Sequence, residues 1–127
     1  MPTGTVTFLF SDIEGSTVRW EAYPEAMRDA VRAHDALMRA AIESNSGYVF
    51  KTIGDAFCAA FRTAKDGIAA ALSAQQALDA TDFSAVDGVF VRMALHTGTA
   101  DERDNDYTYR REKPDRITLF GIGRDCP

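Results

Sequence analysis

The amino-acid sequence predicts an α+β domain whose elements follow the order β-α-β-β-α-β. Two observations predict this order. Short apolar stretches with a period of two residues alternate with longer stretches of helical period, and two of the strand-like stretches are separated only by a Gly-Asp dipeptide. With 127 residues, of which 46% are hydrophobic, the chain can bury one compact core. We therefore expect one domain built on one sheet.

The first element is a strand over residues 5–10. Its residues are mostly β-branched or aromatic and alternate between two faces. One of these faces carries Val6, Phe8 and Phe10. The strand ends at Ser11-Asp12, and Gly15 then admits a tight turn into a short helix that we expect over residues 17–22.

Two amphipathic helices show recognisable start and stop signals. Pro24 lies where the first helical turn tolerates proline, and apolar residues recur at helical spacing until Asn-Ser-Gly at 45–47 ends the pattern. In the second helix, Thr63 and Asp66 have the spacing of a capping box. The apolar face of this helix runs to about Ala80.

Two strands between these helices form a predicted hairpin. Residues 48–53 and 56–61 are short apolar runs. Gly54-Asp55 separates them, and such a dipeptide between strand-like runs is typical of a hairpin turn. Asp55 therefore comes directly before the second of these strands.

A last strand is expected over residues 89–96, where apolar and polar residues alternate, and Gly98 ends it. The complete order is that of the ferredoxin-like or split βαβ fold, an antiparallel sheet with both helices on one face. In that fold the first and third strands are antiparallel neighbours. We therefore expect Asp12, at the end of the first strand, to meet Asp55, at the beginning of the third.

Two carboxylates at such a point repel each other unless they share a cation. Oxygen ligands favour magnesium or manganese, so a two-metal phosphoryl-transfer site is the natural interpretation. The turn after Asp12 supports this interpretation, because exposed N–H groups at a helix start can hold phosphate oxygens. An aspartate at a strand end or in a Gly-Asp turn is also a common cap or turn residue. The residues alone leave a nucleotide-binding palm-like domain and a structural role both open.

Charge and chain patterning exclude some partners. The net charge is −5 and no block of lysine or arginine precedes the tail, so we expect neither nucleic acid nor an anionic membrane as a partner. A nucleoside triphosphate remains compatible, because divalent cations can bridge carboxylates and phosphates. The N-terminus has no signal-peptide pattern and no apolar run reaches membrane-spanning length, so a cytoplasmic location is expected.

Three motifs occur in order: TFLFSDIEGST at 7–17, KTIGDAF at 51–57 and RMALHTG at 92–98. With these motifs the chain closely resembles the class III adenylate/guanylate cyclase family over residues 3–107. The resemblance implies a dimer with active sites at the subunit interface, which converts a nucleoside triphosphate to its 3',5'-cyclic monophosphate and pyrophosphate. It also implies two Mg²⁺ or Mn²⁺ ions held by Asp12, Asp55 and the backbone carbonyl of Ile13.

The resemblance further implies how substrate is bound. The backbone around four residues would cradle the phosphates: Glu14, Gly15, Ser16 and Thr17. Lys51 matches the lysine with which adenylate-type members read the purine ring, and Asp106 falls where they place its acidic partner. This pair favours adenine, whose N1 accepts a hydrogen bond and whose 6-amino group donates one. ATP is therefore the expected substrate.

The pattern breaks after Tyr107. Family members continue into a helix that carries an asparagine and, four residues later, an arginine, which orient the ribose and stabilise charge on the α-phosphate. Residues 108–127 contain no asparagine, so we expect residues 1–107 to be the N-terminal part of a cyclase domain and 108–127 to be a divergent tail whose order the sequence leaves open. Turnover by this chain alone should be weak or absent. A homodimer, or a heterodimer with a complete cyclase domain, is the expected assembly.

Two alternatives to an active adenylate cyclase remain open. One is a catalytically silent module that binds nucleotide or dimerises. The other, by fold analogy alone, is the palm of a diguanylate cyclase or polymerase. That alternative calls for a Gly-Gly-Asp/Glu-Glu/Asp-Phe hairpin, whereas residues 53–57 read Ile-Gly-Asp-Ala-Phe. The hairpin sequence therefore favours the cyclase interpretation over the palm.

Overall fold

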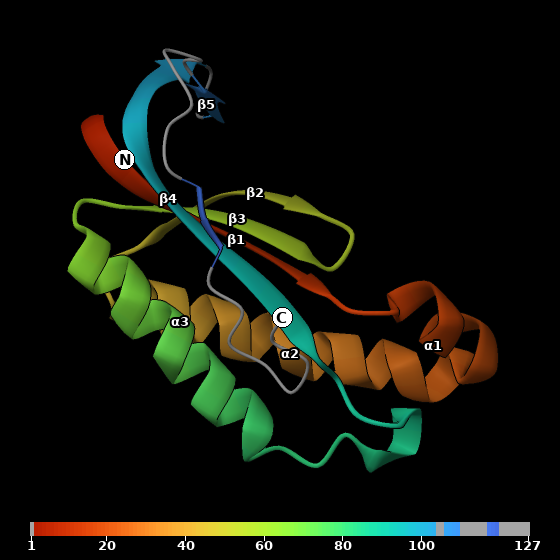
Figure 1. The fold of residues 1–127 in the computed structure, drawn as a ribbon. Coiled ribbons are helices and arrows are strands. Elements are labelled where there is room, and N and C mark those ends of the chain that lie inside the picture. Colours follow the sequence, from red (N-terminus) through yellow and green to blue (C-terminus); the bar gives the residue numbers. More distant parts are fainter. Residues whose placement is uncertain (1, 104–105, 110–116, 120–127) are drawn as a thin grey trace.

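The structure is a computed structural model that describes residues 2–103, 106–109 and 117–119 (Figure 1). Its strands are β1 (Gly4–Ile13), β2 (Tyr48–Ile53), β3 (Ala56–Phe61), β4 (Val91–Arg103), β5 (Asp106–Tyr109) and β6 (Ile117–Leu119). Its helices are α1 (Ser16–Ala22), α2 (Pro24–Ser44) and α3 (Ala64–Asp79), with a short 3₁₀ helix, η1, at Ser84–Val86. Within the described residues, no helix combines the length and apolar character needed to cross a membrane.

The sheet is antiparallel and has the strand order β2-β3-β1-β4-β5, with β6 also pairing with β4. Figure 1 shows α2 and α3 on the same face of the sheet. The first and third strands, β1 and β3, are neighbours, as the sequence predicts. The expected ferredoxin-like α+β fold is therefore confirmed.

The main core lies between the sheet and the two long helices. Leu9 and Ile13 project from β1 into this layer and contribute to one large buried cluster with residues of α2 and α3. Small residues bring α3 close to the sheet, since Ala70 and Ala74 are fully buried and a Cβ at Gly67 would lie 3.1 Å from Thr7 Cγ2. This close packing fixes β1, the strand that carries Asp12.

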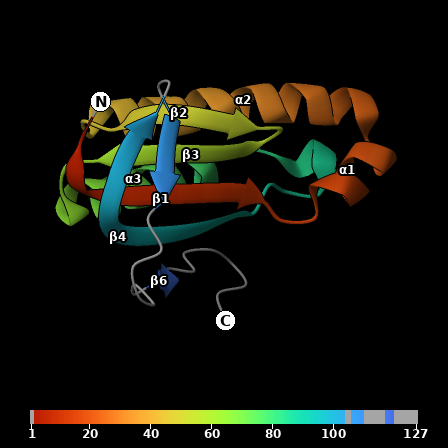
Figure 2. The same cartoon turned by 90° about the horizontal axis from the view of Figure 1, so that it is seen from above.

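A second, smaller cluster lies on the opposite face of the sheet. Val6, Phe8 and Ala60 are buried there, and Phe50 packs against them. Seen from above, β5 crosses this face, and it contacts β2 (Figure 2). The cluster covers the half of β1 remote from Asp12, so the other half of this face remains more open.

The local signals at helix ends are confirmed. Thr63 caps α3, and its hydroxyl accepts a hydrogen bond of 3.1 Å from the backbone N–H of Asp66. Pro24 is the first residue of α2, which ends at Ser44. The hairpin strands have the expected bounds at both ends.

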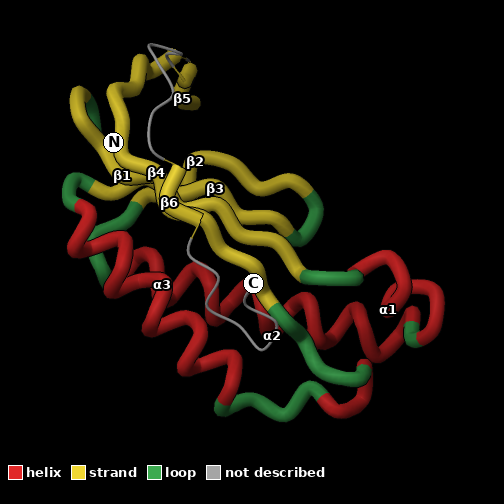
Figure 3. The backbone as a smooth tube through the Cα atoms, viewed as in Figure 1, coloured by secondary structure: helices red, strands yellow, loops and turns green. Residues whose placement is uncertain are grey.

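The expected ends of the last strand were wrong. β4 begins at Val91 rather than at residue 89 and continues through Gly98 to Arg103, as one long strand (Figure 3). Gly98 pairs with Val6 of β1, so it lies inside the strand and not in a turn. Its missing side chain leaves room for the ring of His96. A Cβ at this position would lie 2.9 Å from His96 Nε2. β1 is likewise longer than expected and contains Asp12 and Ile13.

Candidate active site

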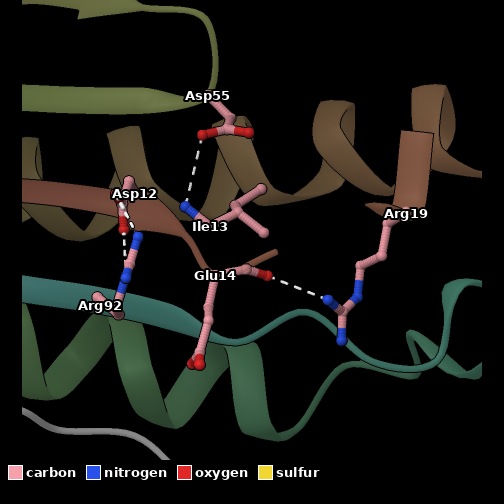
Figure 4. Close-up of polar contacts among 6 residues, drawn as sticks. All are labelled: Asp12, Ile13, Glu14, Arg19, Asp55 and Arg92. Atoms are coloured by element: carbon pink, nitrogen blue, oxygen red, sulfur yellow. Dashed lines mark hydrogen bonds and ion pairs between the residues drawn. The ribbon is translucent and has the colours of Figure 1, made fainter. Parts of the chain in front are cut away.

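The residues of the candidate site lie where β1, the β2–β3 turn and the start of β4 come together (Figure 4). Ser11 of β1 pairs with Phe57 of β3, so the antiparallel register brings Asp55 opposite Ile13. On the other side, Asp12 pairs with Arg92 of β4. The topology therefore brings both predicted metal aspartates to the same end of the sheet.

The side chain of Asp55 is hydrogen-bonded to the backbone of β1. Its Oδ1 accepts a hydrogen bond of 3.4 Å from the N–H of Ile13 (Figure 4). The residue before it, Gly54, has a φ of 59°, a conformation that glycine adopts without steric cost. The tight turn thus directs the Asp55 carboxylate toward the end of β1, where the sequence predicted it.

The Asp12 carboxylate forms an ion pair with Arg92. Arg92 donates from Nε to Oδ1 at 2.9 Å and from Nη2 to Oδ2 at 2.8 Å, a bidentate pair (Figure 4). This hydrogen bonding and the charge of Asp12 raise the pKa of Arg92 above its ordinary value. Arg92 was not among the predicted site residues. Its position opposite Asp12 depends on the register of β1 with β4, which the sequence alone does not give.

The segment from Glu14 to Thr17 connects β1 to α1. Glu14 donates its backbone N–H to Phe90 O at 2.7 Å, and Gly15 has a φ of 64°. The helix α1 begins at Ser16 without a side-chain cap, and Thr17 is exposed. The segment expected to cradle phosphates therefore lies directly after the two β1 residues expected to bind metal.

Comparison with known proteins identifies the family. Residues 1–103 match the family described as "Adenylate and Guanylate cyclase catalytic domain". The chain belongs to this family. Among curated relatives of this cyclase domain, an adenylate cyclase of Schizosaccharomyces pombe is 36% identical over 96 residues, which are 74% of this chain and 6% of that protein. A receptor-type adenylate cyclase of Trypanosoma brucei, GRESAG 4.3, is 36% identical over 87% of this chain and 8% of its own length.

Solved structures of cyclases agree with this assignment. An adenylate cyclase of Trypanosoma brucei, solved in its monomeric state, superposes with a TM-score of 0.77 at 28% identity, covering 87% of this chain and 65% of that one. An adenylate/guanylate cyclase/hydrolase from Silicibacter pomeroyi has a TM-score of 0.68 and covers 84% of this chain and 63% of that one; at 23% identity it supports the fold alone. The chain thus spans about two thirds of the cyclase structures it matches, and less than a tenth of the two curated relatives named above.

The two residues expected to read the purine lie on elements of the cyclase domain that touch each other. Lys51 is exposed on β2 and pairs with Cys58 of β3. Asp106 is the first residue of β5, where it pairs with Arg103, and β5 contacts β2. The side chain of Asp106 lies outside the described part of the chain, so the pairing of Lys51 with Asp106 stays a prediction.

A shallow cavity of about 360 Å³ lies on the open sheet face of the cyclase domain, beside Asp12. Phe10 and Cys58 line it, together with Asp12 and Arg92. A larger cavity, of about 620 Å³, lies between α3 and residues 83–91, and neither Asp12 nor Asp55 lines it. The smaller cavity is therefore the one that adjoins the expected chemistry.

Removing Arg92 should make the cyclase domain bind Mn²⁺ more tightly in the absence of nucleotide. Arg92→Ala eliminates a cation that competes for Asp12. Because the Asp12 and Arg92 side chains are 45% and 64% exposed, we expect only about a two- to fivefold gain, the scale of a solvent-exposed pair. Isothermal titration calorimetry measures it, with Arg32→Ala as control, since Arg32 contacts Asp29 at 3.9 Å on the distant surface of α2. Unchanged or weaker Mn²⁺ binding would show that Arg92 does not compete.

The cyclase domain should also lose a specific stabilisation at alkaline pH. Tyr23 donates to Asp87 Oδ2 at 2.8 Å, and this hydrogen bond, together with the charge of Asp87, raises the pKa of Tyr23 above its ordinary 10.0. A raised pKa stabilises the fold fully below the unfolded value and less as pH rises through the folded value. We expect the stability advantage of the wild type over Tyr23→Phe to be constant at neutral pH and to shrink as the pH rises above about 10 in denaturant unfolding. Parallel pH profiles of the two proteins would contradict it.

Proposed function

We propose that this chain is an adenylate cyclase-type domain that converts ATP to 3',5'-cyclic AMP and pyrophosphate at an interface with a second cyclase domain. The observation that supports the proposal is the placement of Asp12, Ile13 and Asp55 at one end of the sheet in a chain of this family. A site for the ribose and triphosphate there, on the open side of the sheet, is consistent with the adjoining cavity.

The residues present fit a pair of Mg²⁺ or Mn²⁺ ions. The protein would supply two carboxylates, those of Asp12 and Asp55, and the Ile13 carbonyl; within the described residues no group of three His, Cys, Asp or Glu side chains gathers. All of these donors are oxygens, which hard cations prefer. The Asp12 carboxylate already accepts a guanidinium in bidentate geometry, so it is accessible to a cation. When bound, the ions supply charge neutralisation for the triphosphate and a lowered pKa for the ribose 3'-hydroxyl.

Other residues of this chain would bind and select the nucleotide. The backbone N–H groups around Glu14 to Thr17 would hold the phosphates. Lys51 would donate to N1 of adenine, and Asp106 would accept from the 6-amino group. Guanine presents the opposite donor and acceptor pattern at these positions, so this pair selects ATP.

The open face of the sheet favours a protein partner. Phe10 is 41% exposed there although it is a large apolar side chain, and it lies beside Asp12 in the cavity on that face. A second cyclase domain placed on this face would cover Phe10 and close the site. We propose that the partner is another copy of this chain or a complete cyclase domain, in a compartment that holds ATP and magnesium, as the cytoplasm does.

One observation favours a second candidate function. No residue after Tyr107 reproduces the asparagine and arginine that class III cyclases carry there, so residues 108–127 act as a divergent tail in this proposal. Without those two residues the domain would bind a metal-nucleotide complex, or dimerise, without turnover. This alternative is a silent binding module that uses the same site.

Product analysis separates the two candidates. The purified chain is incubated with ATP and Mn²⁺, alone and with a complete cyclase domain whose own metal aspartates have been replaced. Formation of cyclic AMP in the mixture supports the proposal, because only this chain then supplies metal ligands. Binding of Mn²⁺–ATP without product would favour the silent module. Absence of both binding and product would contradict both candidates.

A further inference from the structure

Arg19 of α1 gathers backbone carbonyls from two segments that are far apart in the sequence. Its Nε donates to Val86 O at 3.1 Å and to Gly88 O at 2.7 Å, and Nη2 donates to Asp87 O at 3.3 Å. Its Nη1 donates to Glu14 O at 3.0 Å and to Gly15 O at 3.5 Å. One guanidinium therefore ties the segment after β1 to the segment before β4. Figure 4 shows its bond to Glu14.

Other contacts near Arg19 also link the segment after β1 to the segment before β4. Its Cζ lies 5.4 Å from the centre of the Phe90 ring, in cation–π geometry. The backbone hydrogen bond from Glu14 N to Phe90 O joins the same two segments directly. The five acceptors of Arg19 are all neutral backbone carbonyls. In each of these hydrogen bonds only the donor, the guanidinium, carries a charge.

The backbone adopts unusual conformations to bring these carbonyls together. Asp87 and Gly88 have φ angles of 60° and 85°, and Gly15 has 64°. A Cβ at Gly15 would lie 3.0 Å from Arg19 Nη1, so the guanidinium occupies the space that a side chain would need. Left-handed conformations cost free energy, most for a non-glycine residue such as Asp87, and persist only where the surrounding contacts enforce them. Arg19 supplies part of those contacts, beside the backbone hydrogen bonds from Asp87 N to Ser84 O and from Gly88 N to Phe83 O.

The orientation of the carbonyls determines the orientation of the neighbouring N–H groups. In a trans peptide the C=O of one residue and the N–H of the next point in opposite directions. Because the Glu14 and Gly15 carbonyls point toward Arg19, the N–H groups of Gly15 and Ser16 point away from it. These are among the N–H groups that would face the phosphates in the proposed function.

We infer that Arg19 is a positioning residue that holds the 14–17 segment, and with it the Gly15 and Ser16 N–H groups, in the orientation that accepts a nucleoside triphosphate. The inference rests on the proposed function, because only a chain that binds nucleotide has a triphosphate to position. Arg19 itself does not touch substrate in this arrangement, since its donors are committed to carbonyls. It acts through the backbone on either side of the site.

The first measurement needs no ligand. Amide hydrogen exchange is compared in the wild type, Arg19→Gln, Arg19→Lys and the control Arg32→Gln, whose arginine makes a single exposed contact with Asp29. In Arg19→Gln we expect the hydrogen-bonded amides of Glu14, Val86 and Gly88 to exchange about tenfold faster or more, with α2 and α3 unchanged. Arg19→Lys should show a smaller effect. An ammonium group keeps the positive charge and can still donate to carbonyls, although it lacks the planar geometry of a guanidinium. Unchanged exchange in Arg19→Gln would overturn the inference whatever nucleotide does.

The second measurement uses Mn²⁺–ATP and adenosine as probes, followed by the fluorescence of Trp20, the single tryptophan of the chain. Because a misplacement of about 1 Å can cost about 10²-fold, we expect Arg19→Gln to weaken Mn²⁺–ATP at least about tenfold and leave adenosine unchanged. Arg19→Lys should partly restore the preference for ATP. The ratio of the two affinities is decisive, because a general loss of structure would lower both together.

Three further outcomes are informative. Equal losses for Mn²⁺–ATP and adenosine would overturn the positioning role. So would faster exchange of the Glu14, Val86 and Gly88 amides with no change in Mn²⁺–ATP affinity. If the wild type binds no Mn²⁺–ATP although the exchange effect is present, the proposed function fails and the triphosphate part of the inference fails with it, while the link between the two segments is supported.

Discussion

Replacing Asp55 by asparagine is expected to lower cyclic AMP formation about 10³-fold in a mixture where this chain supplies the only metal aspartates, because a bound metal is worth several kcal/mol of transition-state stabilisation. The substitution removes one of two carboxylates that would bind the ions. Asparagine keeps an oxygen that can accept the 3.4 Å hydrogen bond from Ile13 N. The turn should therefore keep its position while the charge is lost.

Stability should respond differently from activity. With no cation bound, Asp55 lies near the end of β1, which also carries Asp12, so removing one negative charge relieves repulsion. We expect the thermal unfolding midpoint of Asp55→Asn to equal or exceed that of the wild type. The matched control is Asp29→Asn, whose aspartate is 80% exposed on α2 and should leave cyclic AMP formation unchanged. Full activity of Asp55→Asn would contradict the metal-ligand role.

Much of the fold could be predicted because its signals are local. The Gly54-Asp55 turn, the Thr63 cap and Pro24 each act within a few residues, and each predicted its element with nearly correct bounds. The strand end predicted at Gly98 was wrong because a glycine can occur either in a turn or where another group approaches the backbone closely. Only the position of the His96 ring, seen in three dimensions, distinguishes these two uses.

The candidate site was predictable in its location but not in its contacts. The strand order follows from the element order, and it brings Asp12 and Asp55 to one end of the sheet without knowledge of any side chain. The contact of Asp12 with Arg92 joins residues 80 positions apart and depends on the register of β1 with β4. No sequence spacing encodes such a register.

The contacts of Arg19 lie even further from what a sequence reveals. Its acceptors at Val86 and Gly88 are backbone carbonyls, which every residue carries, so their residue types give no signal. On α1 this arginine resembles any solvated helix residue. Only the folded structure shows that the carbonyls of residues 86–88 are directed at its guanidinium.

The chain alone is expected to form cyclic AMP roughly 10³-fold more slowly, or worse, than its mixture with the complete, aspartate-substituted cyclase domain, because an arginine that stabilises the transferring phosphoryl group contributes on that scale. We expect this chain to supply Asp12 and Asp55 but not the asparagine and arginine of the family, since residues 108–127 contain no asparagine. The substituted partner supplies the asparagine and arginine but lacks the metal aspartates. Each protein should therefore be silent by itself, and activity should require both.

The dependence on concentration gives the decisive control. If the active site forms between two chains, cyclic AMP formation should rise with partner concentration and saturate, and Phe10→Glu on the open face should shift that saturation to higher concentration. Ile68→Glu is the matched control, because Ile68 is equally exposed, at 41%, but lies on α3 on the helical side of the sheet. Robust activity from the chain alone, unaffected by Phe10→Glu, would mean that the site is complete within one chain. In that case other residues of this chain must stabilise the α-phosphate, and the interface would have no part in catalysis.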